Sequence, residues 1–313
     1  MKCVLIGGTG LIGRPLAVAL LKQGYEVTIL TRDAKKRSEL QSSLPKAEWL
    51  IGDLHQSEVL KLALNKADIV FHLASSVNPQ TSNDNPILDI ESNLIGSLNL
   101  LEQARLNRVK KIIFVSSGGA VYGIPQMLPI PETHPTQPLS SYGIVKLAIE
   151  KYLYLYHHIY GLDYCVLRVA NAYGNLVPSN QNFGAVDTFV QQALKNEAID
   201  IWGDGLTIRD YIHVDDIVNA LLLTISYQGS EKIFNIGSGS GISLNELIVL
   251  IEMGLKHQFP VNYLKGRAVD VPANILDTSL AKLSLQWAPQ ISLPEGIRSL
   301  IQYWQVISGQ ELL

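Results

Sequence analysis

Two kinds of apolar pattern alternate along the first half of the chain. Short runs in which almost every residue is apolar predict buried strands, and longer stretches with an apolar residue every three or four positions predict helices. The strands are expected at 2–6, 26–30, 48–51, 68–73, 111–116 and 163–169, and the two longest helices at 87–105 and 142–160. Strands without a polar face that alternate with helices are typical of a parallel sheet covered on both faces. The pattern therefore predicts a Rossmann-type, doubly wound α/β fold.

The second half, from Asn171 onward, is more irregular and carries many Gly, Pro and Asn residues in loops. Its expected elements are short strands at 199–202 and 232–236 and helices near Val214, Leu244 and Pro294. We expect a dinucleotide-binding domain over 1–170, to which the segment near 213–236 returns. The rest, 171–313, is expected to form a smaller, interleaved α/β lobe that mainly binds substrate. Such a lobe would close over the carboxyl ends of the strands, where open α/β sheets bind ligands.

The composition excludes several classes of partner. The chain has 313 residues and a net charge of −3, and its longest basic run is Lys35-Lys36-Arg37, so no nucleic-acid partner is expected. No apolar stretch reaches the roughly 18 residues that a membrane span needs, and the first residues read as a core strand rather than a signal peptide. Cys3 and Cys165 lie in strand-like runs and are expected to be buried free thiols, with no metal site. We therefore expect a cytoplasmic protein.

The first strand runs directly into a glycine-rich turn, Gly7-Gly8-Thr9-Gly10-Leu11-Ile12-Gly13. Glycines at 7 and 10 would let the backbone approach phosphate, and Gly13 would let the next helix pack closely on the sheet. The context of strand, turn and helix makes this pattern more specific than a glycine-rich loop alone. It predicts that the pyrophosphate of a dinucleotide binds at the helix N-terminus.

Tyr142 and Lys146 are four residues apart at the start of a predicted helix, so their side chains share one face. A free tyrosine has a pKa of about 10. A neighbouring ammonium and the positive nicotinamide ring of an oxidised cofactor would favour the phenolate. The phenolate could then take a proton from a substrate hydroxyl while hydride leaves the same carbon. An apolar strand that ends at Ser116-Ser117 supports a catalytic role for this pair.

These residues belong to a longer series of motifs through which the chain resembles a known family. The series is Gly7 to Gly13, Gly52-Asp53-Leu54, Phe71-His72-Leu73-Ala74, Asn93, Val121-Tyr122-Gly123, Tyr142 with Lys146, Arg168 to Asn171, Arg209 to Asp216, and Arg267 to Asp270. Over nearly its whole length the chain resembles the extended short-chain dehydrogenases/reductases, and among them the NAD-dependent nucleotide-sugar epimerase/dehydratase family.

The resemblance implies a set of cofactor-binding residues. Asp53 and Leu54 would contact adenine, and the segment from Leu73 through Ala74 to Ser75 would line the cofactor. The other expected cofactor contacts come from the glycine turn, the strand ends and the catalytic helix: Gly7, Thr9, Gly10, Leu11, Ile12, Gly13, Arg32, Asn93, Ser116, Tyr142 and Lys146. His72 and His213 are expected to be packed structural histidines.

The resemblance also implies a substrate site in the second half of the chain. Asn171 would bind the sugar or its diphosphate, Arg209 and Arg267 would grip the diphosphate, and Asp270 would accept from the nucleotide ribose. Guanidinium groups suit this task because they make bidentate bonds to phosphate oxygens. Ser117, Gly118 and Tyr211 complete the expected set. Ion pairs of Arg209 with Asp210 or Asp215, and of Arg267 with Asp270, are the structural alternatives.

The catalytic segment departs from the family at Gly118, where members carry a serine or threonine. Ser117, one residue earlier, could hold the substrate hydroxyl instead, or Tyr142 could work without a helper. Gly119 and Ala120 stand where sugar dehydratases carry an acid/base Asp-Glu pair, so elimination of water is not expected, and the missing Glu argues against decarboxylation. Glycines at 118 and 119 are expected to leave room for a sugar to rotate.

The cofactor is expected to be NAD, although one position leaves NADP open. NAD-specific members end the second strand with an acidic residue for the adenosine 2′-hydroxyl, whereas this chain has Thr31 followed by Arg32. A threonine with an adjacent arginine is compatible with a 2′-phosphate. Alternatively, Arg32 stacks on adenine, with Asp33 nearby.

The expected activity is an NAD-dependent 4-epimerase of a nucleotide-diphosphate sugar, of the UDP-glucose/UDP-galactose type or an N-acetylated relative. It would act by oxidation at C4, rotation of the 4-keto sugar and return of hydride. The first alternative is an NADP-dependent reductase of a nucleotide 4-keto-6-deoxysugar, and the second is a dinucleotide-sensing protein without turnover. A homodimer through the helices that begin near Ile87 and Tyr142 is expected from the family.

Overall fold

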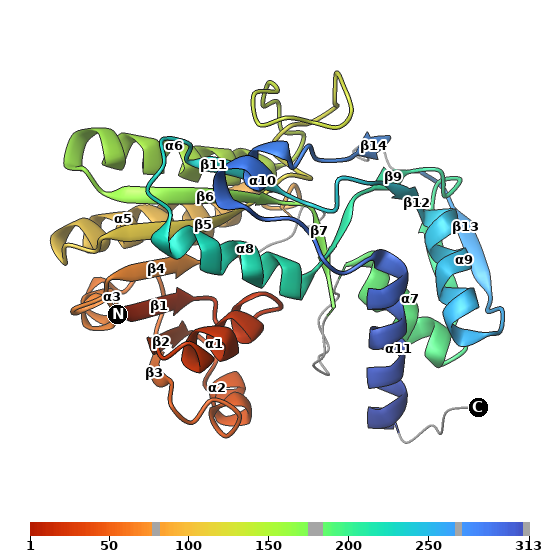
Figure 1. The fold of residues 1–313 in the computed structure, drawn as a ribbon, viewed down its shortest axis with the longest axis horizontal. Coiled ribbons are helices and arrows are strands. Elements are labelled where there is room, and N and C mark those ends of the chain that lie inside the picture. Colours follow the sequence, from red (N-terminus) through yellow and green to blue (C-terminus); the bar gives the residue numbers. More distant parts are fainter. Residues whose placement is uncertain (77–81, 175–183, 267–270, 309–313) are drawn as a thin grey trace.

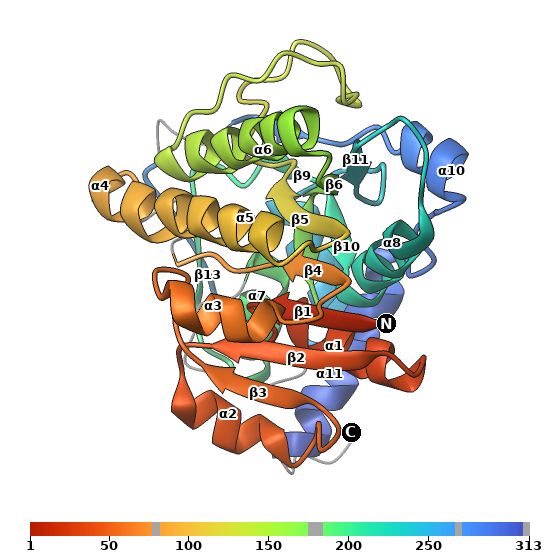
Figure 2. The ribbon, with the colours of Figure 1, turned by 90° about the vertical axis from the view of Figure 1, so that its left-hand side faces the viewer.

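The computed structural model describes residues 1–76, 82–174, 184–266 and 271–308. Its centre is a seven-stranded parallel sheet with the order β11-β6-β5-β4-β1-β2-β3. In Figure 2, strands β3, β2, β1, β4 and β5 follow one another from the bottom of the view upward. The strands are β1 (Lys2–Ile6), β2 (Glu26–Thr31), β3 (Glu48–Ile51), β4 (Ile69–His72), β5 (Lys111–Ser117), β6 (Asp163–Val169) and β11 (Ile233–Ile236). The order reverses direction between β1 and β4, as in a doubly wound Rossmann-like fold.

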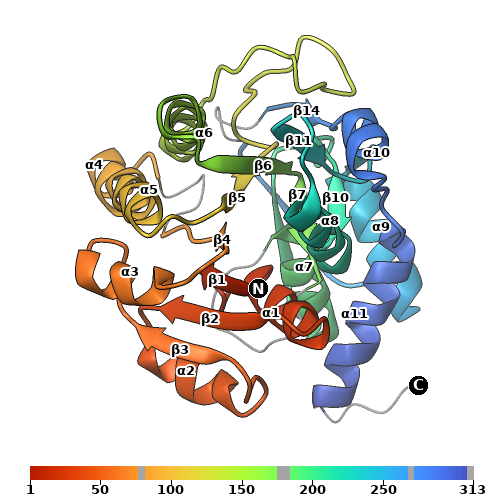
Figure 3. The same ribbon diagram turned by 60° about the vertical axis from the view of Figure 1, so that its left-hand side comes forward.

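Both faces of the sheet are buried, because successive apolar residues of each strand point to opposite sides. Cys3 and Leu5 pack under α1 (Gly13–Lys22) and α8 (Val214–Ser226). Val4 and Ile6 pack on the other side, under α3 (Ser57–Leu64), α5 (Gly96–Leu106) and α6 (Ser141–Tyr160). Figure 3 shows these two helical layers on either side of the sheet. The near-continuous apolar strands of the sequence are explained by this double burial.

The helix expected over 87–105 is not a single regular helix. It consists of α4 (Pro86–Asp89), a π-helical turn η1 (Ile90–Ile95) and α5. The hydroxyl of Ser92 donates to the carbonyl of Leu88, and that of Ser97 donates to the carbonyl of Asn93, both at 2.5 Å. Serine hydroxyls that bond to carbonyls one turn earlier compete with the regular backbone ladder, which accounts for the local widening.

The second half forms a smaller lobe at the carboxyl end of the sheet (Figure 1). Its core lies among α7 (Ala185–Leu194), α9 (Leu244–Leu255) and α11 (Leu293–Ser308). Short strands surround that core: β7 (Asn171–Tyr173), β8 (Ile199–Trp202), β9 (Ile208–Arg209), β10 (Tyr211–His213), β12 (Ile242–Ser243), β13 (Val261–Leu264) and β14 (Ala273–Asn274). Ala170 alone separates β6 from β7, so the lobe begins where the sheet ends. After β10 the chain returns through α8 to β11 at the sheet edge, and α10 (Ser279–Leu285) packs beside them.

One outer face of the molecule carries many exposed apolar side chains. They lie on or near α4, η1, α5 and α6: Ile87, Leu88, Ile95, Leu106, Ile144, Tyr154, Leu155 and Ile159. None of the helices within the described ranges is long and apolar enough to cross a membrane.

Candidate active site

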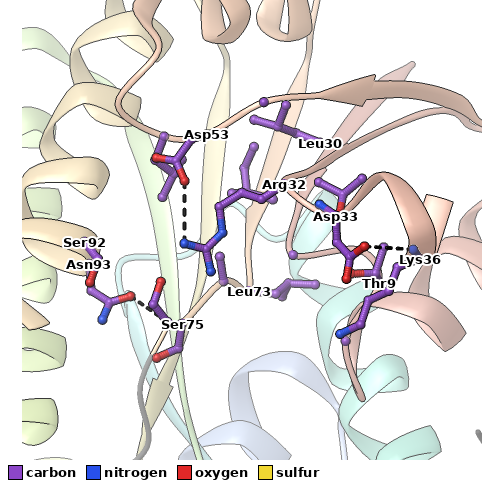
Figure 4. A pocket seen from close by; sticks show the side chains of 18 residues that line it. Thr9, Leu30, Arg32, Asp33, Lys36, Asp53, Leu73, Ser75, Ser92 and Asn93 are labelled. Atoms are coloured by element: carbon purple, nitrogen blue, oxygen red, sulfur yellow. Dashed lines mark hydrogen bonds and ion pairs between the residues drawn. The ribbon is translucent and has the colours of Figure 1, made fainter. Parts of the chain in front are cut away.

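A cavity of about 310 Å³ opens at the carboxyl ends of β1, β2 and β4. Ten of the expected cofactor residues line it: Gly7, Thr9, Gly10, Arg32, Asp53, Leu54, Leu73, Ala74, Ser75 and Asn93. Other expected contacts, Leu11, Ile12, Gly13, Ser116, Tyr142 and Lys146, lie outside the described lining. Asn93 is held in place because its side-chain oxygen accepts from the backbone N–H of Ser76 at 2.9 Å. Figure 4 shows the labelled side chains around this cavity.

Three of the four glycines in the turn, Gly7, Gly10 and Gly13, differ in what a side chain at their position would meet. Gly7 has a φ of +92°, and a Cβ there would lie 2.8 Å from the backbone nitrogen of Ala74. A Cβ at Gly13 would lie 2.3 Å from the carbonyl oxygen of Gly7. A Cβ at Gly10 would meet only that same oxygen, at an ordinary 3.5 Å. The protein itself thus requires glycine at 7 and 13, whereas at Gly10 the space is free for a ligand. Helix α1 begins three residues later, at Gly13, and no side chain caps its N-terminus. The first backbone N–H groups of this helix are therefore suited to bind an anion.

Charged side chains gather at the end of the cavity near β2. Arg32 Nη1 lies 3.6 Å from Asp53 Oδ2, and Asp33 caps α2 (Ala34–Gln41) by accepting from the N–H groups of Lys35 and Lys36. Figure 4 shows Arg32 extended toward Asp53, with Asp33 and Lys36 on its other side. Both a carboxylate and two basic side chains therefore border the region that the sequence assigned to the adenosine 2′ position.

Helix α6 grips the carboxyl end of β5 through three successive residues. Lys146 Nζ donates to the carbonyl of Val115 at 2.9 Å, and the hydroxyl of Ser116 donates to Glu150 at 2.5 Å. The side chain of Ser117 is hydrogen-bonded to Tyr142. Because Tyr142, Lys146 and Glu150 are spaced by four residues, they share the helix face that meets the strand. Ser140 starts this helix by accepting from the N–H of Gly143 at 3.2 Å.

The pKa of Tyr142 differs from what the spacing of Tyr142 and Lys146 predicts. Burial raises the pKa of Tyr142 to about 12, and the hydrogen bond with Ser117 lowers it only in part. Burial also lowers the pKa of Lys146 to about 8, against the opposing effect of Glu150 and Asp89. Lys146 Nζ lies 5.6 Å from the centre of the Tyr142 ring. The expected lowering of the tyrosine pKa by its lysine is thus outweighed by desolvation in the protein alone.

The glycine at 118 does not create the expected room for a sugar. A Cβ there would lie 2.5 Å from Cδ1 of Leu276, so this leucine already fills the space. Gly119 is different, since its Cβ would meet only the hydroxyl of Ser117, at 3.9 Å. Of the two glycines, only Gly119 leaves open space beside Ser117.

The expected substrate residues lie in the smaller lobe. The amide of Asn171 donates to the carbonyl of Asp210 at 2.9 Å, and Arg209 donates to the carbonyls of Ile208 and Val271. The carboxylate of Asp210 is buried and accepts from Ser238 and from the N–H groups of Gly239 and Leu276.

Arg209 and Tyr211 line a second cavity of about 410 Å³, together with the loop 289–294. The hydroxyl of Tyr211 is buried and has no partner among the residues that the structure describes, so it is suited to a polar ligand. Arg267 and Asp270 lie outside the described residues.

Sequence reasoning missed a buried polar network behind Tyr142 and Lys146. Arg168 Nη2 lies 2.6 Å from Glu150 Oε2, and Arg168 also donates to the hydroxyl of Tyr122. The spacing of Glu150, four residues after Lys146, was the signal that could have found it. His72 is a buried structural residue: its Nε2 is 2.7 Å from the hydroxyl of Ser97, and burial lowers its pKa to about 3.

Comparison with known proteins agrees with this arrangement. Residues 3–237 match the NAD dependent epimerase/dehydratase family. The chain belongs to this family. It is 36% identical to a putative UDP-glucose 4-epimerase from Methanocaldococcus jannaschii, with 96% of this chain and 97% of the relative covered.

Two solved structures of family members are also similar over almost the whole chain. A UDP-glucose 4-epimerase from Thermotoga maritima, solved with UDP-glucose, has a TM-score of 0.92 and 36% identity, with 98% of this chain and all of that one covered. The UDP-glucose 4-epimerase from Thermus thermophilus, solved in complex with NAD, has a TM-score of 0.89 and 31% identity, with 97% and 99% covered. The protein is thus a nucleotide-sugar epimerase of the extended short-chain dehydrogenase/reductase type, and NAD is the cofactor of its family.

Proposed function

We propose that the protein is an NAD-dependent 4-epimerase of UDP-hexoses. The observation that carries the proposal is the contact of Tyr142 with Ser117 at the carboxyl end of β5, with Lys146 on the same helix face. The same helix start is linked to the cofactor cavity, because Ser141 and Asn93 both bond to Asp89. A proton-transfer group is thereby tied to the edge of the sheet where a dinucleotide fits.

The residues present fit a dinucleotide. Gly7 and Gly10 would receive the pyrophosphate at the uncapped start of α1, and Asp53 and Leu54 would border adenine. When bound, NAD supplies the acceptor for hydride from C4 of the sugar. Tyr142 would take the proton of the 4-hydroxyl, and Ser117 would orient that hydroxyl.

The second cavity supplies the anchor that a 4-epimerase needs. Arg209 offers a guanidinium and Tyr211 a buried hydroxyl that has no partner within the described ranges, and both are suited to the diphosphate and nucleotide. We propose that Arg267 and Asp270, which lie outside the described residues, complete this anchor. A substrate held by its nucleotide leaves the hexose free to turn over between the two hydride transfers, and Gly119 provides open space near Ser117.

A second candidate is an NADP-dependent reductase of a nucleotide 4-keto-6-deoxysugar. It is favoured by Arg32 and Lys36, two basic side chains that border the cofactor cavity where a 2′-phosphate would lie. In this reaction Tyr142 would act as the acid rather than the base. Such a reductase consumes one reduced cofactor per turnover, whereas an epimerase consumes none.

The deciding experiment uses purified protein without added cofactor. We expect proton NMR to show conversion of UDP-glucose into UDP-galactose to an equilibrium mixture, and mass spectrometry of the released cofactor to show NAD. UDP-N-acetylglucosamine and UDP-glucuronate serve as the alternative substrates. Tyr142→Phe is the matched control, which should bind UDP without turnover. Turnover that requires stoichiometric NADPH would instead support the reductase.

We also propose that the apolar outer face of α5 and α6 forms a homodimer interface. Exposed apolar residues lie on both of these neighbouring helices, among them Leu106 on α5 and Ile144 and Leu155 on α6. Figure 2 shows the two helices side by side on the outside of the sheet. Two copies of such a face would bury apolar area that is otherwise in contact with water.

A further inference from the structure

Asp89 is a buried carboxylate next to the catalytic helix. It is the last residue of α4, and none of its surface is exposed. Its Oδ1 accepts from the amide of Asn93, and its Oδ2 accepts from the hydroxyl of Ser141, both at 2.8 Å. Ser141 directly precedes Tyr142, and Asn93 lines the cofactor cavity. One carboxylate thus connects the start of the catalytic helix to the wall of the cofactor site.

Burying a carboxylate is unfavourable unless hydrogen bonds and a nearby positive charge compensate for the lost water. The amide of Asn93 and the hydroxyl of Ser141 supply hydrogen bonds but no charge. The positive group that Asp89 acts on is Lys146, which is itself buried. The carboxylate and the ammonium therefore stabilise each other inside the protein without direct contact.

Other ionisable groups near the pair do not take over this task. Glu150, on α6, also acts on Lys146, but its carboxylate is bound to Arg168 of β6 at 2.6 Å. His72 of β4 is neutral at physiological pH, because burial and the charge of Lys146 lower its pKa to about 3. Among the carboxylates that act on Lys146, Asp89 is thus the one that is not bound to an arginine.

We propose that Asp89 is a positioning residue for the Tyr142–Lys146 pair. It fixes the first turn of α6 through Ser141, joins that turn to the cofactor wall through Asn93, and places a buried carboxylate beside the start of this helix. The inference rests on the proposed catalytic role of Tyr142 and Lys146.

The sign of the electrostatic effect can be stated in advance. A negative charge makes it harder to remove a proton from any nearby group, and Asp89 raises the pKa of both Tyr142 and Lys146. Removing this charge should lower both values. Because the two groups are close, the pH dependence of kcat reports the pair as a unit. Both limbs of that profile should therefore move to lower pH.

The test compares Asp89→Asn with Ser141→Ala. The first variant keeps the shape and removes the charge; the second removes one hydrogen bond and keeps the charge. We expect Asp89→Asn to shift the kcat profile by about one pH unit toward acid, and Ser141→Ala to lower kcat without moving the profile. Asp89→Glu, which restores the charge, should return the profile toward that of the unaltered protein. Equal profiles for Asp89→Asn and the unaltered protein, apart from a uniform loss of kcat, would overturn the electrostatic part.

A second measurement does not depend on turnover. In protein with ¹³C-labelled lysine side chains, the Lys146 signal is assigned by its loss in Lys146→Met and then titrated by NMR. We expect its midpoint to be lower in Asp89→Asn than in Asp89→Glu. This readout separates the inference from the proposed function, since Lys146 titrates whether or not any UDP-sugar is converted. An unchanged midpoint would contradict the inference. If Asp89→Asn does not fold, Asp89→Ser replaces it, because a hydroxyl can still bond with Ser141 and Asn93.

Discussion

Leu276 occupies the space that a side chain at position 118 would need. Its Cδ1 lies 2.5 Å, and its Cδ2 3.0 Å, from where a Cβ on Gly118 would be. The resemblance to the family implies a serine or threonine at position 118, but Leu276 leaves no room there for a side chain. The hydroxyl that meets Tyr142 comes from Ser117 instead.

Restoring a hydroxyl at position 118 should therefore destabilise the protein. We expect Gly118→Ser to lower the free energy of unfolding by about 1–3 kcal/mol, the range for an overpacked core. Leu276→Ala should make room for the serine. The loss of unfolding free energy caused by Gly118→Ser should therefore be smaller in the presence of Leu276→Ala than in its absence. Chemical denaturation measures all four proteins. Gly119→Ser, placed in open space, is the control and should show no comparable loss.

The glycines of the first turn should separate folding from cofactor binding. Gly10→Val should leave the fold intact and abolish NAD binding, because the valine would occupy the phosphate space rather than clash with the protein. Gly13→Val should destabilise the fold, because its Cβ would lie 2.3 Å from a carbonyl oxygen. Circular dichroism on heating and the amount of NAD released measure the two effects. Tight NAD binding by Gly10→Val would show that the pyrophosphate lies elsewhere.

Tyr142→Phe should reduce turnover by at least roughly a hundredfold with an unchanged melting temperature, because the proton-transfer group is lost. Ser117→Ala should have a smaller, pH-dependent effect. The hydrogen bond from Ser117 lowers the pKa of Tyr142, so its removal raises that pKa further. The acid limb of the rate profile should then move to higher pH. Well below the pKa of Tyr142 the deficit should be the same factor at every pH, and it should shrink only as the pH nears that pKa. A deficit that stays constant through the acid limb and onto the plateau would rule out this role of Ser117.

Arg209→Ala should weaken binding of free UDP by roughly 1.5–3 kcal/mol, the range for a hydrogen bond to a charged group. Arg209→Lys keeps the charge but loses the planar guanidinium. Its affinity for UDP should therefore lie between those of the unaltered protein and Arg209→Ala. Isothermal titration calorimetry is the measurement, and a free hexose should give no signal. The same substitution at Arg267 tests the expected second arginine. If UDP binds both alanine variants normally, the diphosphate anchor is elsewhere.

The proposed dimer can be tested on its exposed apolar face. Leu155→Glu, on α6, should produce a monomer in sedimentation experiments because it places a charge in the interface. Leu283→Glu is the matched control, since Leu283 on α10 is 80% exposed and lies away from α5 and α6. Leu155→Glu should lower the molecular mass of the sedimenting species from that of a dimer to that of a monomer, and Leu283→Glu should leave it unchanged. A monomeric unaltered protein would refute the interface.

The sheet could be predicted from the sequence because both of its faces are buried. Runs such as 69–72 and 164–169 are buried throughout, and such strands leave few alternatives to a parallel sheet covered by helices. The π-helical turn at 90–95 could not be predicted in the same way. It depends on the bonds of Ser92 and Ser97 to backbone carbonyls, and apolar spacing does not report these bonds.

The positions of candidate site residues such as Tyr142 and Asp53 could be predicted from motifs in the sequence. Properties that depend on the surrounding fold, such as a pKa or the space around a residue, could not be predicted as well. Spacing along a helix brings Lys146 near Tyr142, but the direction of the tyrosine pKa depends on burial, which only the fold determines. The role of Gly118 depends on Leu276, which lies far along the chain. Asp89 carries no motif, and its importance comes from what it contacts.

The contacts of α6 with the end of β5 also limit where residues can be inserted into or deleted from this chain. One helix face binds Val115, Ser116 and Ser117 in succession, and inserting one residue between Tyr142 and Glu150 would rotate the remaining helix by about 100°. Such an insertion would separate Tyr142 from the residues that it shares a helix face with. The segment between Gly119 and Ser140 runs mostly outside regular elements, but Ile130 pairs with Leu276, and the hydroxyl of Tyr122 is bound to Arg168. Natural insertions and engineered loops should therefore be tolerated at its exposed stretch 126–129, while 115–117 and 142–150 should keep a fixed length.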